Sequence, residues 1–388
     1  MPPLTNIVHL DADAFFVSCE QARDPSLRGL KCAVGGTTRG IISSASYEAR
    51  AAGVYTPMPT AKALHVCPDL VMIPHTPGLY GRVSQRMFDL CETVTPYVER
   101  RSIDEGYLDG GPCGFRSQGE LESRIRALDA AITAELGIAV SWGLATNKLV
   151  SGIASKLRKP RAFVVVGPGE EAQFLAPLKV GKLPGIGAKT EPLLAAAGLA
   201  TVRDLLSAPE PLLRRFFGDG YRELLAMARG EDDSPVETLA WEAKSYSQQE
   251  TFARDVADFS EIEQVAKRMI DELVPKLRED GKCARTFTLK IRYPGMEDVS
   301  AGQSLPVASD LETDFYPLVA PLLRSAWQRR RPLRLVCVRL SSVEAPARQL
   351  ELFGAVENEK RHKLAAAVDA LKRAKGGAVV TRGHQLRD

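Results

Sequence analysis

The chain has 388 residues, of which 45% are hydrophobic and 26% are charged, and its formal net charge is +3. These values are ordinary for a soluble globular protein, and the length predicts two to four domains. No apolar run approaches the roughly 20 residues of a membrane span. The seven cysteines form no Cys-x-x-Cys pair, so neither a disulfide framework nor a zinc site is indicated, and reduced cysteines in a cytoplasmic protein are expected.

The first predicted strand, residues 7–10, runs into the carboxylates Asp11 and Asp13. Because side chains repeat every second residue along a strand, these two are expected on one face. A short helical stretch follows, bearing Phe15 and Phe16, which as a pair are also typical of a protein core.

Residues 31–76 alternate short strands with helices rich in small residues, and residues 43–50 gather hydroxyl groups and one arginine. Hydroxyl donors and a guanidinium fork suit a triphosphate. By itself this cluster is a weak indication of a nucleotide site.

A second acidic pair, Asp104 and Glu105, lies between two short apolar runs, residues 97–103 and 106–108. This pattern predicts a tight hairpin with carboxylates at its tip. The alternative is that Asp104 and Glu105 are only polar turn residues, since turns favour such side chains. If the hairpin lies beside the first strand, three or four carboxylates converge with no cation near them in the sequence. Such hard oxygen ligands suit Mg²⁺, and a pair of these ions suits in-line phosphoryl transfer.

Two predicted helices flank the hairpin. The first has apolar residues at helical spacing from Leu79 to Val94, and the second opens at Ser117 and stops at Gly137. With the strand at residues 138–144, the order becomes strand, helix, strand, strand, helix, strand, which is the ferredoxin-like split βαβ arrangement. Polymerase palms and nucleotide cyclases both use it, so the fold alone leaves both open.

Residues 146–159 predict a helix whose basic end, at Lys159, can reach phosphates or simply favour a helix C-terminus. Residues 183–187 then form an apolar-Pro-Gly-Ile-Gly turn, a helix-hairpin-helix signature. Its glycines, Gly185 and Gly187, let backbone N–H groups approach a DNA phosphate. A plain glycine-rich turn is the alternative. A cyclase has no need of the signature.

A charged linker around residues 231–235 precedes a last domain of alternating helices and strands. Six arginines and no acidic residue lie between Arg324 and Arg339, including Arg330 and Arg331. This run is either a solvated face or a surface for a polyanion.

The tail contains a short peptide of the kind that docks in an apolar pocket through leucine and phenylalanine anchors. The peptide comprises Gln349, Leu350, Glu351, Leu352 and Phe353. A helix with apolar residues at positions 364, 368 and 371 is predicted after it.

Together these motifs resemble those of Y-family translesion DNA polymerases, in the bacterial DNA polymerase IV branch, over about residues 5–345. The matching stretches are residues 9–16, 46–50, 102–109, 147–148 with 159–160, and 183–187. The resemblance implies an α+β multidomain enzyme that adds deoxynucleotides to a primer end under the direction of a template.

The implied domains are a ferredoxin-like palm, fingers inserted into it, a helical helix-hairpin-helix thumb and a βαββαβ-like little finger. They cover residues 1–13 and 77–166 (palm), 14–76 (fingers), 167–234 (thumb), 235–243 (linker), 244–345 (little finger) and 346–388 (tail).

The resemblance also implies roles by position. Asp11, Asp104 and Glu105, helped by the Ala12 carbonyl, would hold two Mg²⁺ ions, for which Mn²⁺ can substitute, with Asp13 behind them. Phe16, beside Phe15, aligns with the steric gate whose ring collides with a ribose 2′-hydroxyl. The triphosphate-binding positions are Ser44, Tyr47, Arg50 and Lys159.

The implied partners are primer-template DNA, deoxynucleoside triphosphates and the bacterial sliding clamp, which the tail peptide would bind to supply processivity. We expect DNA contacts from Gly185, Gly187, Arg330 and Arg331, a monomer, no membrane partner, and low fidelity because no residues are left over for a proofreading exonuclease. Gly106 stands where the family usually has alanine, which should affect hairpin packing more than chemistry.

A non-catalytic scaffold with a polymerase-like body is the main alternative. Such a relative would be expected to lose the metal-site carboxylates, whereas this chain carries all of them.

Overall fold

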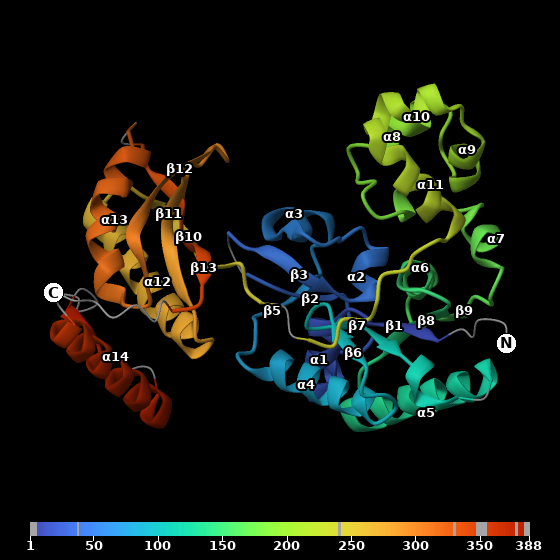
Figure 1. Cartoon of the computed structure of the whole chain (residues 1–388), viewed down its shortest axis with the longest axis horizontal. Helices are drawn as coiled ribbons and strands as arrows, with labels where there is room; N and C mark the ends of the chain where they lie inside the picture. Colours follow the sequence, from blue (N-terminus) through green and yellow to red (C-terminus); the bar gives the residue numbers. More distant parts are fainter. Residues whose placement is uncertain are drawn as a thin grey trace. The chain divides into compact units, whose positions relative to one another are not determined.

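The computed structural model describes residues 6–36, 39–115, 117–239, 242–328, 331–346, 355–376 and 379–383 (Figure 1). The chain divides into two compact units, residues 1–240 and 241–388. Of the residues singled out from the sequence, Arg330 and the tail peptide (Gln349, Leu350, Leu352, Phe353) lie outside the described residues.

A five-stranded sheet forms the centre of the first unit. Its strands are, in order, β6 (Val98–Arg100), β7 (Glu105–Asp109), β1 (Ile7–Ala12), β8 (Val140–Ala145) and β9 (Phe163–Val165). All neighbours are antiparallel except β8 and β9. Without β9, this is the strand order of a ferredoxin-like βαββαβ domain, so the prediction of a ferredoxin-like palm is confirmed.

Helices α4 (Leu79–Glu92) and α5 (Gln118–Leu136) pack together on one side of this sheet, and α6 (Lys148–Leu157) packs against β1 and β8 on the other (Figure 1). The predicted ends of α5 are confirmed: the Ser117 side chain accepts a hydrogen bond from the Glu120 backbone N–H, and Gly137 ends the helix with φ of 68°.

The strand β8 is buried along its whole length, including Ser141 and Gly143 on the side that faces α6. A Cβ atom on Gly143 would lie 2.1 Å from the Ser151 carbonyl oxygen and 2.6 Å from the Ser155 backbone nitrogen. Glycine is therefore required for α6 to approach the sheet this closely. The close approach matters because α6 ends next to the carboxylates of β1.

The fingers form a second, smaller sheet inserted after β1 and α1 (Phe15–Arg23). Its order is β4 (Met58–Pro59), β3 (Ile41–Ala45), β2 (Cys32–Gly35) and β5 (Val71–Ile73), and the helices α2 (Tyr47–Ala51) and α3 (Thr60–Val66) accompany it. Ile42, Met58 and Ala63 are buried in a core of its own.

The thumb is helical, as predicted. It contains α7 (Glu171–Leu175), α8 (Glu191–Ala196), α9 (Val202–Ser207), α10 (Glu210–Phe217) and α11 (Tyr221–Arg229). The turn at residues 183–187 leads into α8, and Gly185 has φ of 87°, which favours glycine. The element before this turn is a single 3₁₀ turn, Val180–Lys182, rather than a full α-helix.

The second unit follows the predicted βαββαβ chain order, but its sheet order differs from that of the palm. The strands are β10 (Ser245–Val256), β13 (Leu333–Glu344), β11 (Cys283–Arg292) and β12 (Asp298–Ser309), in that order. Helices α12 (Phe259–Glu279) and α13 (Glu312–Ala326) bury their apolar sides against the sheet through one continuous core.

A last helix, α14 (Ala355–Lys375), docks on α12 and α13 by charge. The Arg278 guanidinium of α12 binds Glu312 of α13 at 2.8 Å and Asp369 of α14 at 2.9 Å. Leu364 and Leu371 are 67% and 44% exposed, so the apolar spacing that predicted this helix does not mark its docking face.

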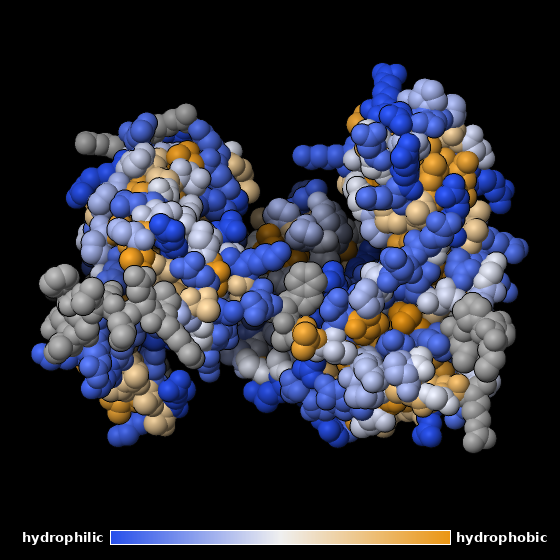
Figure 2. Space-filling view, in the orientation of Figure 1, coloured by the Kyte–Doolittle hydropathy of each residue, from blue (hydrophilic) through white to orange (hydrophobic). Residues whose placement is uncertain are grey.

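Hydrophilic residues cover most of the face drawn in Figure 2, with small, separate groups of hydrophobic ones. Within the described ranges, none of the helices has the length and hydrophobicity needed to cross a membrane.

Candidate active site

The two acidic motifs meet because β1 and β7 are neighbours in the sheet. Their register pairs Asp11 with Glu105, and the Ala12 backbone N–H donates to the Asp104 carbonyl at 2.9 Å. The turn before β7 is held by Ser102, whose hydroxyl donates to Asp104 Oδ1 at 2.5 Å and accepts from the Glu105 backbone N–H at 3.1 Å. The predicted hairpin with carboxylates at its tip is therefore confirmed.

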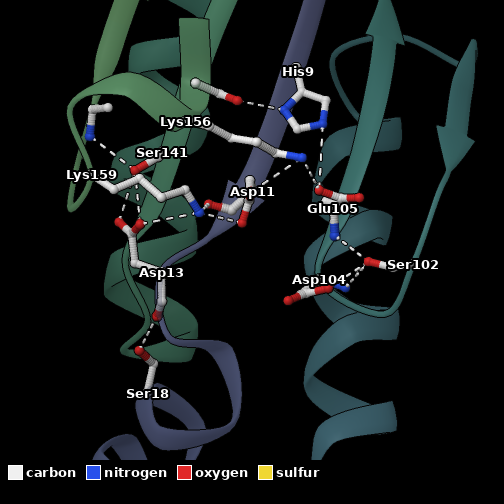
Figure 3. A network of polar contacts seen from close by, with 12 residues as sticks. His9, Asp11, Asp13, Ser18, Ser102, Asp104, Glu105, Ser141, Lys156 and Lys159 are labelled. Atoms are coloured by element: carbon white, nitrogen blue, oxygen red, sulfur yellow. Dashed lines mark hydrogen bonds and ion pairs between the residues drawn. The ribbon is translucent and has the colours of Figure 1, made fainter. Parts of the chain in front are cut away.

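Two lysines from the end of α6 and the loop after it reach into this acidic group (Figure 3). Lys156 Nζ lies 2.7 Å from Glu105 Oε2 and 4.0 Å from Asp11 Oδ2. Lys159 Nζ donates to Asp11 Oδ1 and lies 3.6 Å from Asp13 Oδ1. The expectation that the carboxylates converge with no cation near them is wrong, because the tertiary structure brings these two lysines to them.

Asp13 is buried and has several hydrogen-bond partners. Its carboxylate accepts from the Ser141 hydroxyl at 2.9 Å, the Arg161 backbone N–H at 2.7 Å and the Tyr47 hydroxyl at 3.1 Å. It thus joins β1 to β8, to the loop after α6 and to the fingers. This arrangement agrees with a place behind the other carboxylates and favours a structural role for Asp13.

Asp11 lies deeper than Glu105, with side-chain exposures of 14% and 30%. Burial raises the pKa of the Asp11 carboxyl, while the charges of Lys159 and Lys156 act in the opposite direction. His9, two residues earlier on β1, is buried between Ser155 and Glu105, and burial, with the nearby Lys156, lowers its pKa to about 3. The imidazole is therefore neutral at physiological pH.

The candidate ligands are carboxylates and the Ala12 carbonyl, with no soft ligand among them. Their chemistry therefore suits a hard divalent cation. The side chains are not arranged around a common point: across the part of the chain that the structure describes, no three acidic, histidine or cysteine side chains form a metal-binding group. Asp104 is turned toward Ser102, and Glu105 toward Lys156. A cation there requires the carboxylates to turn away from these partners.

A cavity of about 170 Å³ opens beside the carboxylates. Its walls bring together most of the residues predicted from the sequence: Asp11, Ala12, Phe15, Phe16, Ser44, Arg50, Asp104 and Lys159. The chain enters α1 through Ala14, whose φ of 45° is a left-handed conformation that costs a non-glycine residue about 1–2 kcal/mol. This turn places both phenylalanines next to the acidic group.

Some of the predicted site residues do not line the cavity, among them Tyr47, Glu105 and Arg331. Tyr47 directs its hydroxyl to Asp13, and neither Tyr47 nor Glu105 is among the residues that line the cavity. Arg331 belongs to the second unit, where its guanidinium lies 5.1 Å from the centre of the Tyr293 ring.

The structure adds residues that the sequence reasoning missed. Ser43 and Thr56 line the cavity, Tyr80 stacks on Phe16, and Lys156 binds Glu105. Ser43 belongs to the hydroxyl-rich stretch at residues 43–50 but had no role of its own assigned there. Tyr80 and Lys156 carry no local signal, since their significance depends on partners far away in the sequence.

Family models match three parts of the chain. The model described as the impB/mucB/samB family matches residues 10–156, and that of the family's C-terminal domain matches residues 243–352. A third model, the IMS family HHH motif, matches residues 168–199.

Curated relatives match along nearly the whole chain. A protein named DNA polymerase IV from Opitutus terrae is 63% identical over 384 residues, covering 99% of this chain and 98% of that protein. Another DNA polymerase IV, from Dehalococcoides mccartyi strain 195, is 35% identical over 394 residues, covering 99% of each chain.

Solved structures give the same picture. A Y-family DNA polymerase chimera of Dbh and Dpo4 superposes with a TM-score of 0.79 at 26% identity, covering 88% of this chain and 99% of that one. An insertion ternary complex of Dbh DNA polymerase gives a TM-score of 0.62 at 25% identity with the same coverage.

Proposed function

The chain belongs to the Y family of DNA-directed DNA polymerases, in its DNA polymerase IV branch, and from this premise we propose that it extends primers past damaged template bases, with Mg²⁺ and without proofreading. One observation carries the proposal. The β1–β7 register brings Asp11 next to Glu105 and Asp104, at the edge of a cavity lined by Phe16, Arg50 and Lys159.

Asp11, Asp104 and Glu105, with the Ala12 carbonyl, are the residues that would hold two divalent ions. When bound, such ions would lower the pKa of the primer 3′-hydroxyl and stabilise charge on the pyrophosphate that leaves. Catalysis on this scaffold would otherwise be a matter of positioning and charge stabilisation. Mn²⁺ offers the same charge and suits the same oxygen ligands.

The cavity residues would bind the incoming nucleotide. Arg50 and Lys159 provide a guanidinium and an ammonium for the triphosphate, and Ser44 provides a hydroxyl. Lys159 would exchange its contact with Asp11 for the phosphate oxygens. That exchange frees Asp11 at the moment when the substrate arrives.

Phe16 would act as the steric gate for the sugar. Its ring lines the cavity and is backed by Tyr80, so it has little room to yield to a 2′-hydroxyl. A rigid clash rejects an added group more strongly than a lost attraction does.

The thumb and little finger would hold the primer-template DNA. The backbone at Gly185 and Gly187 can approach a phosphate, and the arginines between positions 324 and 339 add positive charge. We further propose that Gln349, Leu350, Leu352 and Phe353 dock in an apolar pocket of the bacterial sliding clamp, that the polymerase itself is a monomer, and that it acts in the cytoplasm.

Primer extension tests the function directly. Purified chain is given Mg²⁺, all four deoxynucleotides and a primer on either an undamaged or a lesion-containing template. The matched variant is Asp104→Asn with Glu105→Gln, which keeps side-chain size and removes two charges. We expect the unmodified chain to extend the primer on both templates and the double variant to extend it on neither.

Three other outcomes would overturn parts of the proposal. Unchanged extension by the double variant would refute the assignment of the carboxylates. Failure of the unmodified chain to extend any primer, while it still binds the sliding clamp, would favour the non-catalytic scaffold. Degradation of a mismatched primer end would contradict the absence of proofreading.

A further inference from the structure

Lys156 approaches the candidate metal ligands but has no part in the proposed nucleotide site. It lies in the last turn of α6, which the close contact at Gly143 fixes against β1 and β8. From there its ammonium reaches 2.7 Å from Glu105 Oε2 and 4.0 Å from Asp11 Oδ2 (Figure 3). The side chain does not line the cavity formed with Arg50 and Lys159.

Two facts define what this ammonium does to its surroundings. The register places Asp11 and Glu105 opposite each other on neighbouring strands, where two like charges repel. Lys156 lies close to both carboxylates, so a cation that binds both would have to enter space that the ammonium already uses. The lysine is thus a monovalent cation, supplied by the protein, at a place suited to a divalent one.

Lys156 is also free to leave. Its side chain is 48% exposed, whereas that of Lys159 is 19% exposed, and a lysine ammonium moves on a flexible four-carbon stem. Displacing it therefore costs one exposed ion pair and no rearrangement of the backbone.

We propose that Lys156 is a positioning residue that holds Glu105 in the free enzyme and competes with divalent cations for the Asp11–Glu105 pair. This inference rests on the proposed assignment of these carboxylates as metal ligands. Lys156 thereby weakens cation binding before DNA and nucleotide arrive. It also keeps Glu105 paired, so that the carboxylates do not repel each other while the site is without substrate.

The test measures Mn²⁺ binding to the full chain without DNA or nucleotide, by the electron paramagnetic resonance signal of free Mn²⁺ at low ionic strength. Lys156→Gln is expected to lower the Kd for Mn²⁺ by about five- to tenfold, because a positive charge that competes with the ion for the same carboxylates is removed. Lys156→Arg, which retains the charge, should stay near the unmodified protein. Raising the salt concentration should reduce the difference.

Arg158→Gln is the matched control. It removes the same charge two residues further along, from an exposed side chain at the end of the same helix. The Kd of the Arg158→Gln variant for Mn²⁺ should change by less than twofold. Equal effects of Lys156→Gln and Arg158→Gln, or no effect of either, would overturn the role of Lys156 and leave the metal site standing.

A second control separates failure of this inference from failure of the proposed function. Asp11→Asn with Glu105→Gln must abolish the Mn²⁺ binding that the unmodified chain shows. If binding persists in that double variant, the metal-ligand assignment is wrong, and the inference about Lys156 fails with it. Melting curves of every variant establish that the fold is retained.

Discussion

The rings of Phe16 and Tyr80 stack with their centroids 4.3 Å apart and their planes at 29°. Tyr80 is itself held, since its hydroxyl donates to Glu20 Oε1 at 2.8 Å and accepts from the Thr76 backbone N–H at 3.2 Å. The wall of the cavity at Phe16 therefore rests on a second ring that is fixed by α1 and by the loop before α4.

Replacing Phe16 by alanine should admit ribonucleotides. The ring then no longer meets the 2′-hydroxyl, and we expect discrimination between deoxy- and ribonucleotides to fall on the order of a hundredfold. Single-nucleotide insertion with dCTP and CTP gives the ratio of kcat/KM values. An unchanged ratio would refute the assignment of Phe16 as the gate.

Tyr80 should support the same selectivity indirectly. Tyr80→Leu removes the ring behind Phe16, so we expect a partial loss of sugar discrimination, about three- to tenfold, mainly through a lower KM for ribonucleotides. Tyr80→Phe keeps the ring and loses only the two hydrogen bonds, and it should retain more of the selectivity. If Tyr80→Leu discriminates as well as the unmodified enzyme, Phe16 is rigid without this support.

Gly106 should be essential for packing of the hairpin. A Cβ atom at this position would lie 2.5 Å from the Glu99 carbonyl oxygen and 2.8 Å from Phe88 Cε1. Gly106→Ala should therefore destabilise the first unit by about 1–3 kcal/mol, which is the typical cost of forcing an extra group into a well-packed protein core. Gly119→Ala in α5 is the control, because its nearest neighbour is 3.9 Å away and no loss is expected. Urea unfolding compares the two.

Arg278 should hold α14 in place. Its side chain is 12% exposed and binds Glu312 and Asp369, so Arg278→Met leaves two poorly solvated carboxylates without this partner. We expect a loss of about 3 kcal/mol and faster hydrogen exchange along α14. Arg292→Met, which breaks a more exposed pair with Asp298, should cost less than about 1 kcal/mol. Equal exchange in α14 for both variants would contradict this account.

The cysteines should differ in reactivity and should affect stability at high pH. Burial raises the pKa of Cys91 from the ordinary 9.0 to about 12, whereas Cys113 is only half-buried. Iodoacetamide at pH 8.5 should therefore label Cys113 long before Cys91 in the folded protein. An equal labelling rate, measured by peptide mass spectrometry, would show that the first unit opens readily.

The raised pKa of Cys91 also makes the folded protein less stable as the pH rises above 9. Between pH 9 and about 12 the unfolded chain loses the Cys91 proton while the folded chain keeps it, so stability falls as the pH rises, by about 1.4 kcal/mol per pH unit at most. Cys91→Ala should reduce this slope, and unfolding at pH 8, 9.5 and 10.5 measures it.

The palm, the carboxylate hairpin and the family can all be recognised from the amino-acid sequence alone. These features depend on neighbours a few residues apart: the strand that ends at Asp11, the acidic pair at the turn before β7, the cap at Ser117 and the glycines at 185 and 187. Short-range chemistry of this kind can be recognised in one dimension, and so can the spacing of motifs that marks a family.

Three other features depend on tertiary packing: the cations beside the carboxylates, the support behind Phe16 and the docking of α14. Lys156 meets Glu105 because α6 packs across β8, and Tyr80 meets Phe16 because α4 lies beside α1. For α14, apolar spacing predicted a helix, but its docking depends on Asp369 meeting Arg278 of α12. Contacts of this kind join distant segments, and their geometry is fixed by packing that no local pattern records.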